Sequence, residues 1–380
     1  MRYLVCPDSF KGSMSSIVAS EAIADGLRQA DPGADIVLLP LADGGEGTSG
    51  IVGEALSGVF ISVSTVDALG REIKSGWWKA DIGGRSVAIL DVASASGLTL
   101  IDSKERDIMS ATSIGTGIII RSALEAGVKD FIIGLGGSAT NDGGLGILEA
   151  LGWRMFDAKG ELLKGNGEGL TRVAALLPPE NITYSGIRIK LLCDVKNSFY
   201  GPAGAACVFA SQKGANEKDI SILDEGLRNL NRLFVSLGGE DVSSMPGAGA
   251  AGGIGGMFLS LFGAEMRSGI DEVLDLCRFE ELLDNADFVI TGEGRIDSQT
   301  LGGKTLSGVV DRVKDRRVGL IGFCGSLDHS AVEKLISAGF TSIYPITQVG
   351  ESLSEAMQPE IARRNLVKAV KKWVGDRGLK

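Results

Sequence analysis

The sequence predicts an α/β protein of two domains, in which a second, mixed α/β domain is inserted into a domain built on a parallel sheet. Three observations support this class. Short apolar runs alternate with helical patterns at both ends of the chain, a β-rich stretch with period-two alternation begins near Gly58, and glycine-rich loops follow several apolar runs. A chain of 380 residues is also long for a single hydrophobic core, which favours two domains.

The first elements predict the start of a parallel sheet. Residues 3–7 form an apolar run typical of a strand, and Ser15 or Ser16 is a suitable N-cap for a helix that continues to about Ala30. Residues 35–40 predict a second strand, which leads into a glycine loop and another helix. Two strand–helix pairs in succession place their connecting loops at the carboxyl ends of parallel strands.

The middle of the chain has a different pattern. Three β-rich runs with short turns predict an antiparallel meander, at residues 59–66, 72–80 and 86–92. We interpret this meander as the start of a new domain. Further elements are then expected in the order helix, strand, strand and helix, at residues 108–126, 131–133, 187–194 and about 216–237.

The last part of the chain returns to strand–helix alternation. Short buried strands, each followed by a helix, are expected at residues 287–291, 318–323 and 342–346. Because this tail resembles the beginning of the chain, we predict a discontinuous parallel-sheet domain at residues 1–58 and 265–380, with the inserted domain at residues 59–264. The active site is expected in the cleft between the two domains.

Composition excludes several kinds of partner. The net charge of −10 argues against nucleic acid or an anionic membrane, although a divalent cation could bridge carboxylates to the phosphates of a nucleotide. No apolar run has the length of a membrane span, and residues 1–5 resemble a strand more than a signal peptide, so a cytoplasmic protein is expected. The five cysteines lie far apart and four of them sit in apolar runs, which predicts buried free thiols in a reducing compartment.

The single histidine, His329, restricts the chemistry. One imidazole excludes a metal site or proton relay built from several histidines. A Ser-His-Asp triad would have to use His329, and the chain lacks the Gly-x-Ser-x-Gly elbow that accompanies many such triads. We therefore interpret His329 as a loop or helix-cap residue, and proton transfer is left to carboxylates, lysine or water.

The loop from Gly134 to Gly146 is the clearest functional signal. It consists almost entirely of glycine and small polar residues, and it lies between a predicted strand and a helical pattern. Glycines allow several backbone N–H groups to point at one ligand, and a helix N-terminus adds partial positive charge. A phosphate or small-acid cradle and a purely structural turn are equally compatible with this loop alone.

Similar loops recur along the chain. Asp43-Gly44-Gly45-Glu46-Gly47 repeats the form of residues 142–146, and other glycine loops lie at residues 247–253 and 292–294, with Asp297 close behind. Structural turns alone would not require acidic residues at such regular positions. Several carboxylate-bearing loops at strand ends therefore indicate a shared site for a polyanion and a metal ion.

Two nucleotide-binding motifs match only in part. Gly134-x-Gly136-x-x-Ala139, with Asp157 further on, resembles a dinucleotide fingerprint, but residues 140–144 separate it from the helix. Gly303-Lys304-Thr305 ends like a P-loop, yet Ser298 stands where that motif requires its first glycine. Lys304 could still contact phosphate as a single cation.

Charged residues near strand ends are candidates for the chemistry. Asp194 follows a strongly apolar run and is either a turn cap or a working carboxylate, and Lys213 is either a solvated lysine or a phosphate clamp. Glu293 and Asp297 could hold Mg²⁺ or cap a helix. These residues favour phosphoryl transfer, because that chemistry needs positioning, metal and cations but little else from side chains.

These stretches resemble the glycerate kinase type-1 family along nearly the whole chain. The matching segments are residues 7–13, 40–48, 134–144, 193–195 with Asn197, 212–215, 246–253 and 290–299. The resemblance implies ATP-dependent, Mg²⁺-assisted phosphorylation of D-glycerate, and a flavodoxin-like domain with an inserted α/β domain. The family usually has proline where this chain has Ser198, Ser211 and Leu306, which affects loop rigidity more than chemistry.

The site hypothesis assigns a role to each group. Asp194 orients and deprotonates the attacking hydroxyl, while Lys213 and Lys11 offset charge on the transferred phosphoryl group or hold the glycerate carboxylate. Mg²⁺ binds one or more of Asp43, Glu293 and Asp297. The residues expected to bind substrate or phosphate are Asp8, Ser9, Gly44, Gly45, Gly136, Gly137, Ser138, Thr140, Asn141, Asp142, Asn197, Gly249, Gly252 and Lys304.

Two other classes remain compatible with the sequence. An NAD-dependent dehydrogenase of small hydroxy acids would use the Gly134 loop and Asp157, and a non-catalytic hydroxy-acid sensor would keep a carboxylate pocket without phosphate contacts. The residues do not decide between 2- and 3-phosphoglycerate as product, although resemblance to bacterial family members favours the former. A homodimer is compatible with the sequence, which carries no signal for oligomeric state.

Overall fold

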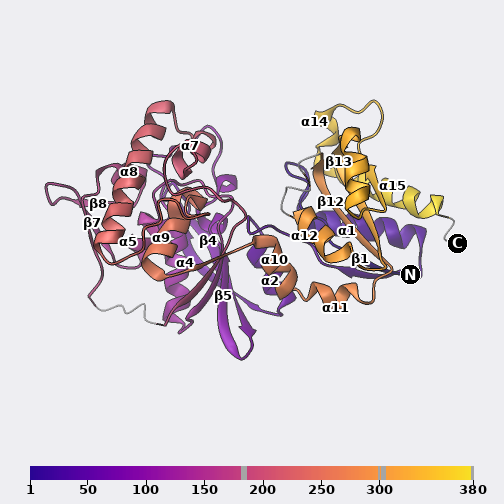
Figure 1. The fold of residues 1–380 in the computed structure, drawn as a ribbon, viewed down its shortest axis with the longest axis horizontal. Helices are drawn as coiled ribbons and strands as arrows, with labels where there is room; N and C mark the ends of the chain where they lie inside the picture. Colours follow the sequence, from indigo (N-terminus) through magenta and orange to yellow (C-terminus); the bar gives the residue numbers. More distant parts are fainter. Residues whose placement is uncertain (181–185, 298–299, 301–304, 378–380) are drawn as a thin grey trace. The chain divides into compact units, whose positions relative to one another are not determined.

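The computed structural model describes residues 1–180, 186–297, 300 and 305–377. The chain forms two compact units, one made of Met1–Asp43 with Ile270–Lys380 and the other of Gly44–Gly269 (Figure 1). One unit contains a parallel sheet and the other a mixed sheet, which confirms the predicted two-domain α/β class.

The first unit contains a five-stranded parallel sheet with the order β2-β1-β12-β13-β14. Its strands are β1 (Arg2–Val5), β2 (Asp35–Leu38), β12 (Phe288–Ile296), β13 (Gly319–Leu327) and β14 (Ser342–Pro345). Counted within the unit, this order is 2-1-3-4-5, the flavodoxin-like arrangement. Winding reverses between β1 and β12, and such folds bind ligands at the carboxyl ends of the strands near this point.

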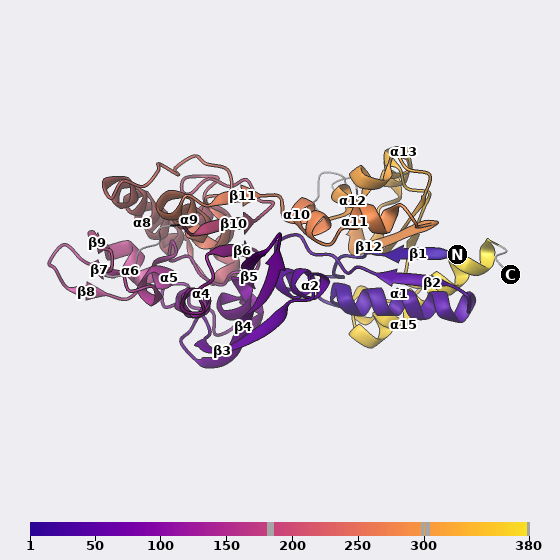
Figure 2. The same cartoon turned by 90° about the horizontal axis from the view of Figure 1, so that it is seen from below.

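Helices cover both faces of the parallel sheet, with α1 and α15 on one side and α12 and α13 on the other (Figure 2). The predicted cap of α1 is confirmed, because the Ser15 side chain accepts a hydrogen bond from the Val18 N–H. Tyr3, Leu27 and Trp373 share the core between α1, α15 and the sheet. The helices of this region are α1 (Ser16–Ala30), α10 (Gly269–Leu276), α11 (Phe279–Leu283), α12 (Thr305–Val313), α13 (Val332–Ala338), α14 (Leu353–Ala356) and α15 (Pro359–Asp376).

The second unit contains a six-stranded sheet with the order β11-β10-β6-β5-β4-β3. The predicted meander is confirmed, because β3 (Val59–Val66), β4 (Glu72–Ile82) and β5 (Arg85–Asp91) pair antiparallel. The remaining strands, β6 (Asp130–Gly134), β10 (Arg188–Leu192) and β11 (Glu265–Arg267), extend the sheet in parallel from β5. Parallel pairing brings the ends of β5, β6 and β10 to one edge, where the glycine loops follow.

Helices and a small second sheet complete this unit. The helices are α2 (Thr48–Ala55), α3 (Ala93–Ser96), α4 (Ile114–Glu125), α5 (Leu145–Ala150), α6 (Gly167–Arg172), α7 (Ala205–Phe209), α8 (Glu217–Ser236) and α9 (Ile254–Phe262). The small sheet has the order β8-β7-β9, with β7 (Arg154–Phe156), β8 (Leu162–Leu163) and β9 (Ala175–Leu177). The longest of these helices, α8, begins with a capping box between Asn216 and Asp219 and buries its apolar face in the core.

Two details differ from expectation. The units divide after Asp43 and Gly269, whereas the predicted limits were 58/59 and 264/265, because α2 packs against β4 and β5 of the second unit. All five cysteines are free, but Cys207 is exposed, contrary to its predicted burial, because only Ala205 and Ala206 of α7 face the core.

Two further expectations concern the role of His329 and the presence of membrane-spanning helices. His329 begins a single 3₁₀ turn that is capped by the Asp328 side chain, in agreement with a loop or cap role. Within the described ranges, no helix combines the length and the apolar character needed to cross a membrane.

The packing of α2 generates a stability prediction. A Cβ at Gly53 would lie 2.3 Å from the Trp78 ring, whereas a Cβ at Gly50 in the same helix meets nothing within 4 Å. We expect Gly53→Ala to lower the free energy of unfolding by about 1–3 kcal/mol through overpacking. Gly50→Ala should instead raise it by about 0.5–1 kcal/mol, because alanine is the better helix former.

Urea unfolding of the two variants and the wild type measures this difference. Equal effects of the two substitutions would show that α2 is not packed on Trp78 as described.

Candidate functional site

Two glycine loops of the second unit pack backbone against backbone at the ends of its parallel strands. The Gly136 N–H donates to the Gly44 carbonyl at 3.1 Å, and a Cβ at Gly136 would lie 2.6 Å from the Gly45 Cα. Gly44 has a φ of +84°, and a Cβ there would lie 2.8 Å from the Leu192 carbonyl oxygen. Glycine is therefore required here by close backbone approach, in addition to any role in binding.

A third loop joins this cluster. Gly252 has a φ of +67°, and its Cβ would lie 2.0 Å from the Thr140 carbonyl oxygen. The Gly143 N–H donates to the Gly252 carbonyl at 3.0 Å, while the Gly249 N–H donates to the Asn197 carbonyl at 3.0 Å. Residues 44–47, 134–146 and 247–253, separate in the sequence, thus meet at one edge of the sheet.

Asp91, at the end of β5, anchors the first of these loops and was not predicted. Its carboxylate accepts hydrogen bonds from the Gly47 N–H at 3.1 Å, the Ser49 N–H at 3.0 Å and the Ser49 hydroxyl at 2.8 Å. Burial raises the pKa of Asp91 to about 7, although these hydrogen bonds favour the charged form. The sequence did carry a signal for Asp91, because it directly follows a buried apolar run. The same pattern was used to select Asp194.

Asp142 anchors the long loop from within. Its fully buried carboxylate accepts from the Ser113 N–H and hydroxyl at 2.7 and 2.8 Å, and from the Gly144 and Gly146 N–H groups at 2.9 and 3.2 Å. Burial raises the pKa of Asp142, whereas these hydrogen bonds favour the charged carboxylate and oppose the shift. These contacts give Asp142 a structural role at the start of α4 and α5, and its contact with substrate stays a prediction.

Lys213 is the buried cation of the cluster, with only 3% of its surface exposed. Its Nζ donates to the Ser138 hydroxyl at 2.8 Å and to the Thr140 carbonyl at 2.7 Å, so neutral oxygens fix its position. Burial lowers the pKa of Lys213 to about 7, opposed by the negative charge of Asp142. Lys213 thus interacts with Ser138, Thr140 and Asp142, three residues that the sequence predicted to bind substrate or phosphate.

The loop that holds this lysine also carries polar side-chain atoms without a partner in the described part of the chain. Asn141 is fully buried, and neither its amide nitrogen nor its amide oxygen has a hydrogen-bond partner among the described residues. The Thr140 hydroxyl is likewise buried and unpaired within them. An unsatisfied buried polar group costs about 1–3 kcal/mol, so these atoms are suited to a small oxygen-rich ligand or ordered water.

The other predicted residues of this unit have defined local roles. Asp194 follows β10, and its Oδ1 accepts from the Gly269 N–H at 2.9 Å. The half-buried Asn197 side chain donates to the Ala203 carbonyl at 2.9 Å. Gly137 has a φ of +78°, and its carbonyl accepts from the Leu98 N–H at 2.8 Å.

A second cluster lies at the predicted ligand position of the first unit, where β1 and β12 end. The Asp8 carboxylate accepts from the Ser9 N–H at 2.6 Å and from the Thr305 hydroxyl at 2.8 Å. The Glu293 carboxylate accepts from the Thr300 hydroxyl at 3.0 Å. Thr300 and Thr305, like Asp91, were missed, because single threonines near a helix start are common in any sequence.

Charges in this cluster influence one another. Burial, together with the negative charges of Asp8 and Asp297, raises the pKa of Glu293 to about 7. The hydrogen bond from Thr300 and the positive charge of Lys11 oppose this shift. The pKa of Asp8 is also raised by burial, with a smaller contribution from Asp43. The five predicted residues Asp8, Lys11, Asp43, Glu293 and Asp297 therefore lie within electrostatic range of a neighbour in the set, whereas Lys304 lies outside the described residues.

The carboxylates do not form a ready metal cage. Among the residues that the structure describes, no group of three or more His, Cys, Asp or Glu side chains is arranged to hold a metal ion. Asp297 in addition pairs with Arg295 at 3.0 Å. Mg²⁺ commonly binds through one or two carboxylates and completes its shell with phosphates and water, so Glu293 and its neighbours fit a substrate-linked ion rather than a permanent one.

The acid of the dinucleotide motif has another role. Asp157 accepts from the N–H groups of Lys159 and Glu161 and pairs with Arg172 at 3.0 Å, so it closes the turn between β7 and β8. These contacts leave no sign of a ribose-binding acid, which disfavours the dehydrogenase alternative.

The fold is that of an α/β protein with glycine loops and acidic residues at the ends of its parallel strands, and comparison with known proteins shows which family it represents. A model described as the glycerate kinase family matches residues 3–375. A protein named glycerate kinase from Bacillus subtilis (strain 168) is 37% identical over 359 residues, which cover 94% of this chain and 93% of that protein. Glycerate 2-kinase from Escherichia coli (strain K12) is 37% identical over 366 residues, covering 94% and 93%.

A solved structure gives the same result. The crystal structure of a "putative glycerate kinase 2" from Salmonella typhimurium LT2 matches with a TM-score of 0.80 and 37% identity, over 100% of this chain and 98% of that one. The chain therefore belongs to the glycerate kinase family, as its motifs imply, and is an enzyme of the kinase class.

The buried lysine generates a prediction for stability against pH. Between about pH 7 and the ordinary lysine value of 10.5, the unfolded chain binds a proton at Lys213 that the folded chain does not. The free energy of unfolding contributed by this group therefore rises with pH in that window, by at most about 1.4 kcal/mol per pH unit. Lys213→Met should remove this rise.

Urea unfolding at pH 7 and pH 9 tests the prediction. Lys79→Met, at an exposed lysine of β4, is the matched control and should keep the wild-type slope. An unchanged slope in Lys213→Met would contradict the described burial.

Proposed function

We propose that this kinase transfers the γ-phosphoryl group of ATP to the 2-hydroxyl of D-glycerate, with Mg²⁺, and forms 2-phosphoglycerate. Family membership supports a glycerate substrate, and the relative named glycerate 2-kinase supports the 2-position. The observation that carries the proposal is the buried Lys213, held by Ser138 and the Thr140 carbonyl. On the same glycine loop, the Thr140 hydroxyl and the Asn141 amide have no hydrogen-bond partner among the described residues.

Phosphoryl transfer depends mainly on positioning and electrostatic stabilisation, and the second unit offers both. Lys213 is held by two neutral acceptors, so its charge requires no rearrangement to act on an anionic oxygen. The Asn141 amide can donate to one substrate oxygen and accept from a hydroxyl. Asp194 is the proposed base that orients and deprotonates the attacking hydroxyl.

The first unit is proposed to serve the metal-bound nucleotide. Glu293, with Asp297 and Asp43, would hold Mg²⁺, which when bound neutralises negative charge on the phosphates. The Glu293 carboxylate is partly buried and is oriented by the Thr300 hydroxyl. Lys11 is exposed near these acids and is proposed to contact phosphate.

A coupled assay of ADP release and phosphorus NMR of the product together test this function. We expect ADP release that requires D-glycerate, ATP and Mg²⁺, stops with a chelator and returns when Mg²⁺ is restored. The product phosphorus should couple to a single proton, as in 2-phosphoglycerate, since the 3-isomer carries its phosphate on a CH₂ group. Coupling to two protons would refute the 2-position, and glycerate binding without ADP release would favour the sensor alternative.

Asp194→Asn tests the proposed base. Asparagine keeps an oxygen that can accept from the Gly269 N–H, so the local fold should persist. Turnover is expected to fall about 100-fold or more while ATP affinity is unchanged, because general base catalysis contributes rate enhancements of this size. Asp315→Asn, at an exposed acid, is the control. A near-normal turnover would remove Asp194 from this role.

A further inference from the structure

Arg106 is a partly buried arginine without a carboxylate partner among the described residues. Its Nη1 donates to the Gln212 carbonyl at 3.0 Å, and its Nε is buried with no hydrogen-bond partner within them. Arg2, Arg228 and Arg312, which are also partly buried, each form an ion pair. Burial of Nε withdraws one edge of this guanidinium from water, and a bound anion would compensate that cost, so Arg106 differs from the other partly buried arginines that the structure describes.

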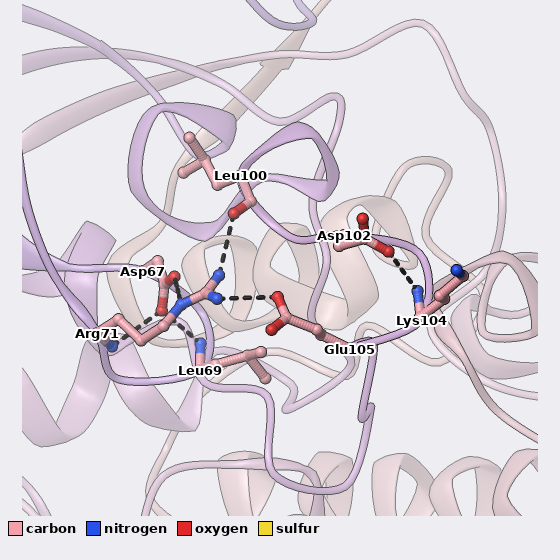
Figure 3. Close-up of polar contacts among 7 residues, drawn as sticks. All are labelled: Asp67, Leu69, Arg71, Leu100, Asp102, Lys104 and Glu105. Carbon is pink, nitrogen blue, oxygen red and sulfur yellow. Dashed lines mark hydrogen bonds and ion pairs between the residues drawn. The ribbon is translucent and has the colours of Figure 1, made fainter.

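The acidic residues beside Arg106 are engaged elsewhere. Glu105 pairs with Arg71 at 2.9 Å, and that guanidinium also binds Asp67 and the Leu100 carbonyl (Figure 3). Asp107 accepts from the Ser110 hydroxyl at 2.6 Å. Within the described part of the chain, both acidic neighbours of Arg106 are thus engaged away from its guanidinium.

Arg106 is also fixed beside the candidate site. A Cβ at Gly214 would lie only 2.7 Å from the Arg106 carbonyl oxygen, so the two backbones touch. The residue whose carbonyl Arg106 binds, Gln212, directly precedes Lys213. Upstream, the segment that leads to Arg106 is tied to the glycine loop by the hydrogen bond from the Leu98 N–H to the Gly137 carbonyl at 2.8 Å.

We propose that Arg106 binds the carboxylate of the hydroxy-acid substrate, an inference that rests on the proposed function. Nη1 is occupied by the Gln212 carbonyl, and the edge formed by Nε and Nη2 has no protein partner within the described residues. That edge donates two parallel hydrogen bonds and matches the two oxygens of a carboxylate. Lys213 then remains for the phosphoryl group, and Arg106 selects acids over neutral alcohols of similar shape.

Steady-state kinetics of Arg106→Met and Arg106→Lys test the inference. Arg106→Met should raise the KM for D-glycerate about 10- to 100-fold, the effect expected from losing a charge-assisted hydrogen-bonded pair, with little change in kcat or in the KM for ATP. Arg106→Lys should recover part of the loss, because it keeps the charge without the planar fork. Arg85→Met, at an exposed arginine that begins β5, should behave as wild type.

Calorimetric titration of D-glycerate without nucleotide provides a second measurement, and urea unfolding shows whether each variant is folded. A folded Arg106→Met variant with unchanged glycerate affinity and KM would overturn the inference, as would a rise confined to the KM for ATP. If the wild type itself releases no ADP with D-glycerate, the proposed function fails. An active wild type with an unaffected Arg106→Met variant refutes only the role of Arg106.

Discussion

The close approach of main chains at the ends of β5, β6 and β10 is the constraint on which the rest of the second unit depends. Gly44 lies against Leu192, and Gly136 lies against Gly45 at distances that leave no space for a Cβ. Such contact is possible only where glycine removes the side chain. It brings the backbone of one loop directly onto another and so sets the position of every polar group those loops carry.

Buried charge stabilises this arrangement. Asp91 and Asp142 each collect several N–H and hydroxyl donors from loops that would otherwise leave those donors unpaired. Neutral oxygens hold Lys213, and burial lowers its pKa. Asn141 and Thr140, on the same loop, keep polar side-chain atoms that have no partner among the described residues. The carboxylates of Asp91 and Asp142 are therefore fully hydrogen-bonded and belong to the scaffold of the loops. The side chains of Asn141 and Thr140 lack such partners among the described residues, which marks them as groups suited to a ligand.

Much of the fold could be predicted because its signals are local. The cap at Ser15, the meander from Val59 and the amphipathic pattern of α8 follow from residue order and propensity alone. The unit boundary after Asp43 could not be predicted, since α2 was assigned by its neighbours in the sequence rather than by its packing on Trp78. The exposure of Cys207 was missed for a similar reason, because an apolar run does not reveal which face of a short helix meets the core.

For the site, the sequence by itself determined the chemical inventory: glycine loops after strands, acids at strand ends, lysines and almost no histidine. Tertiary structure alone decided how these residues are used. It made Asp142 an internal anchor, buried Lys213 and left Arg106 without a carboxylate partner among the described residues. In the sequence, all three look like ordinary charged residues near loops. The physical reason is that pairing and desolvation depend on neighbours distant in the chain, such as Ser113 for Asp142 and Ser138 for Lys213, and local pattern carries no information about them.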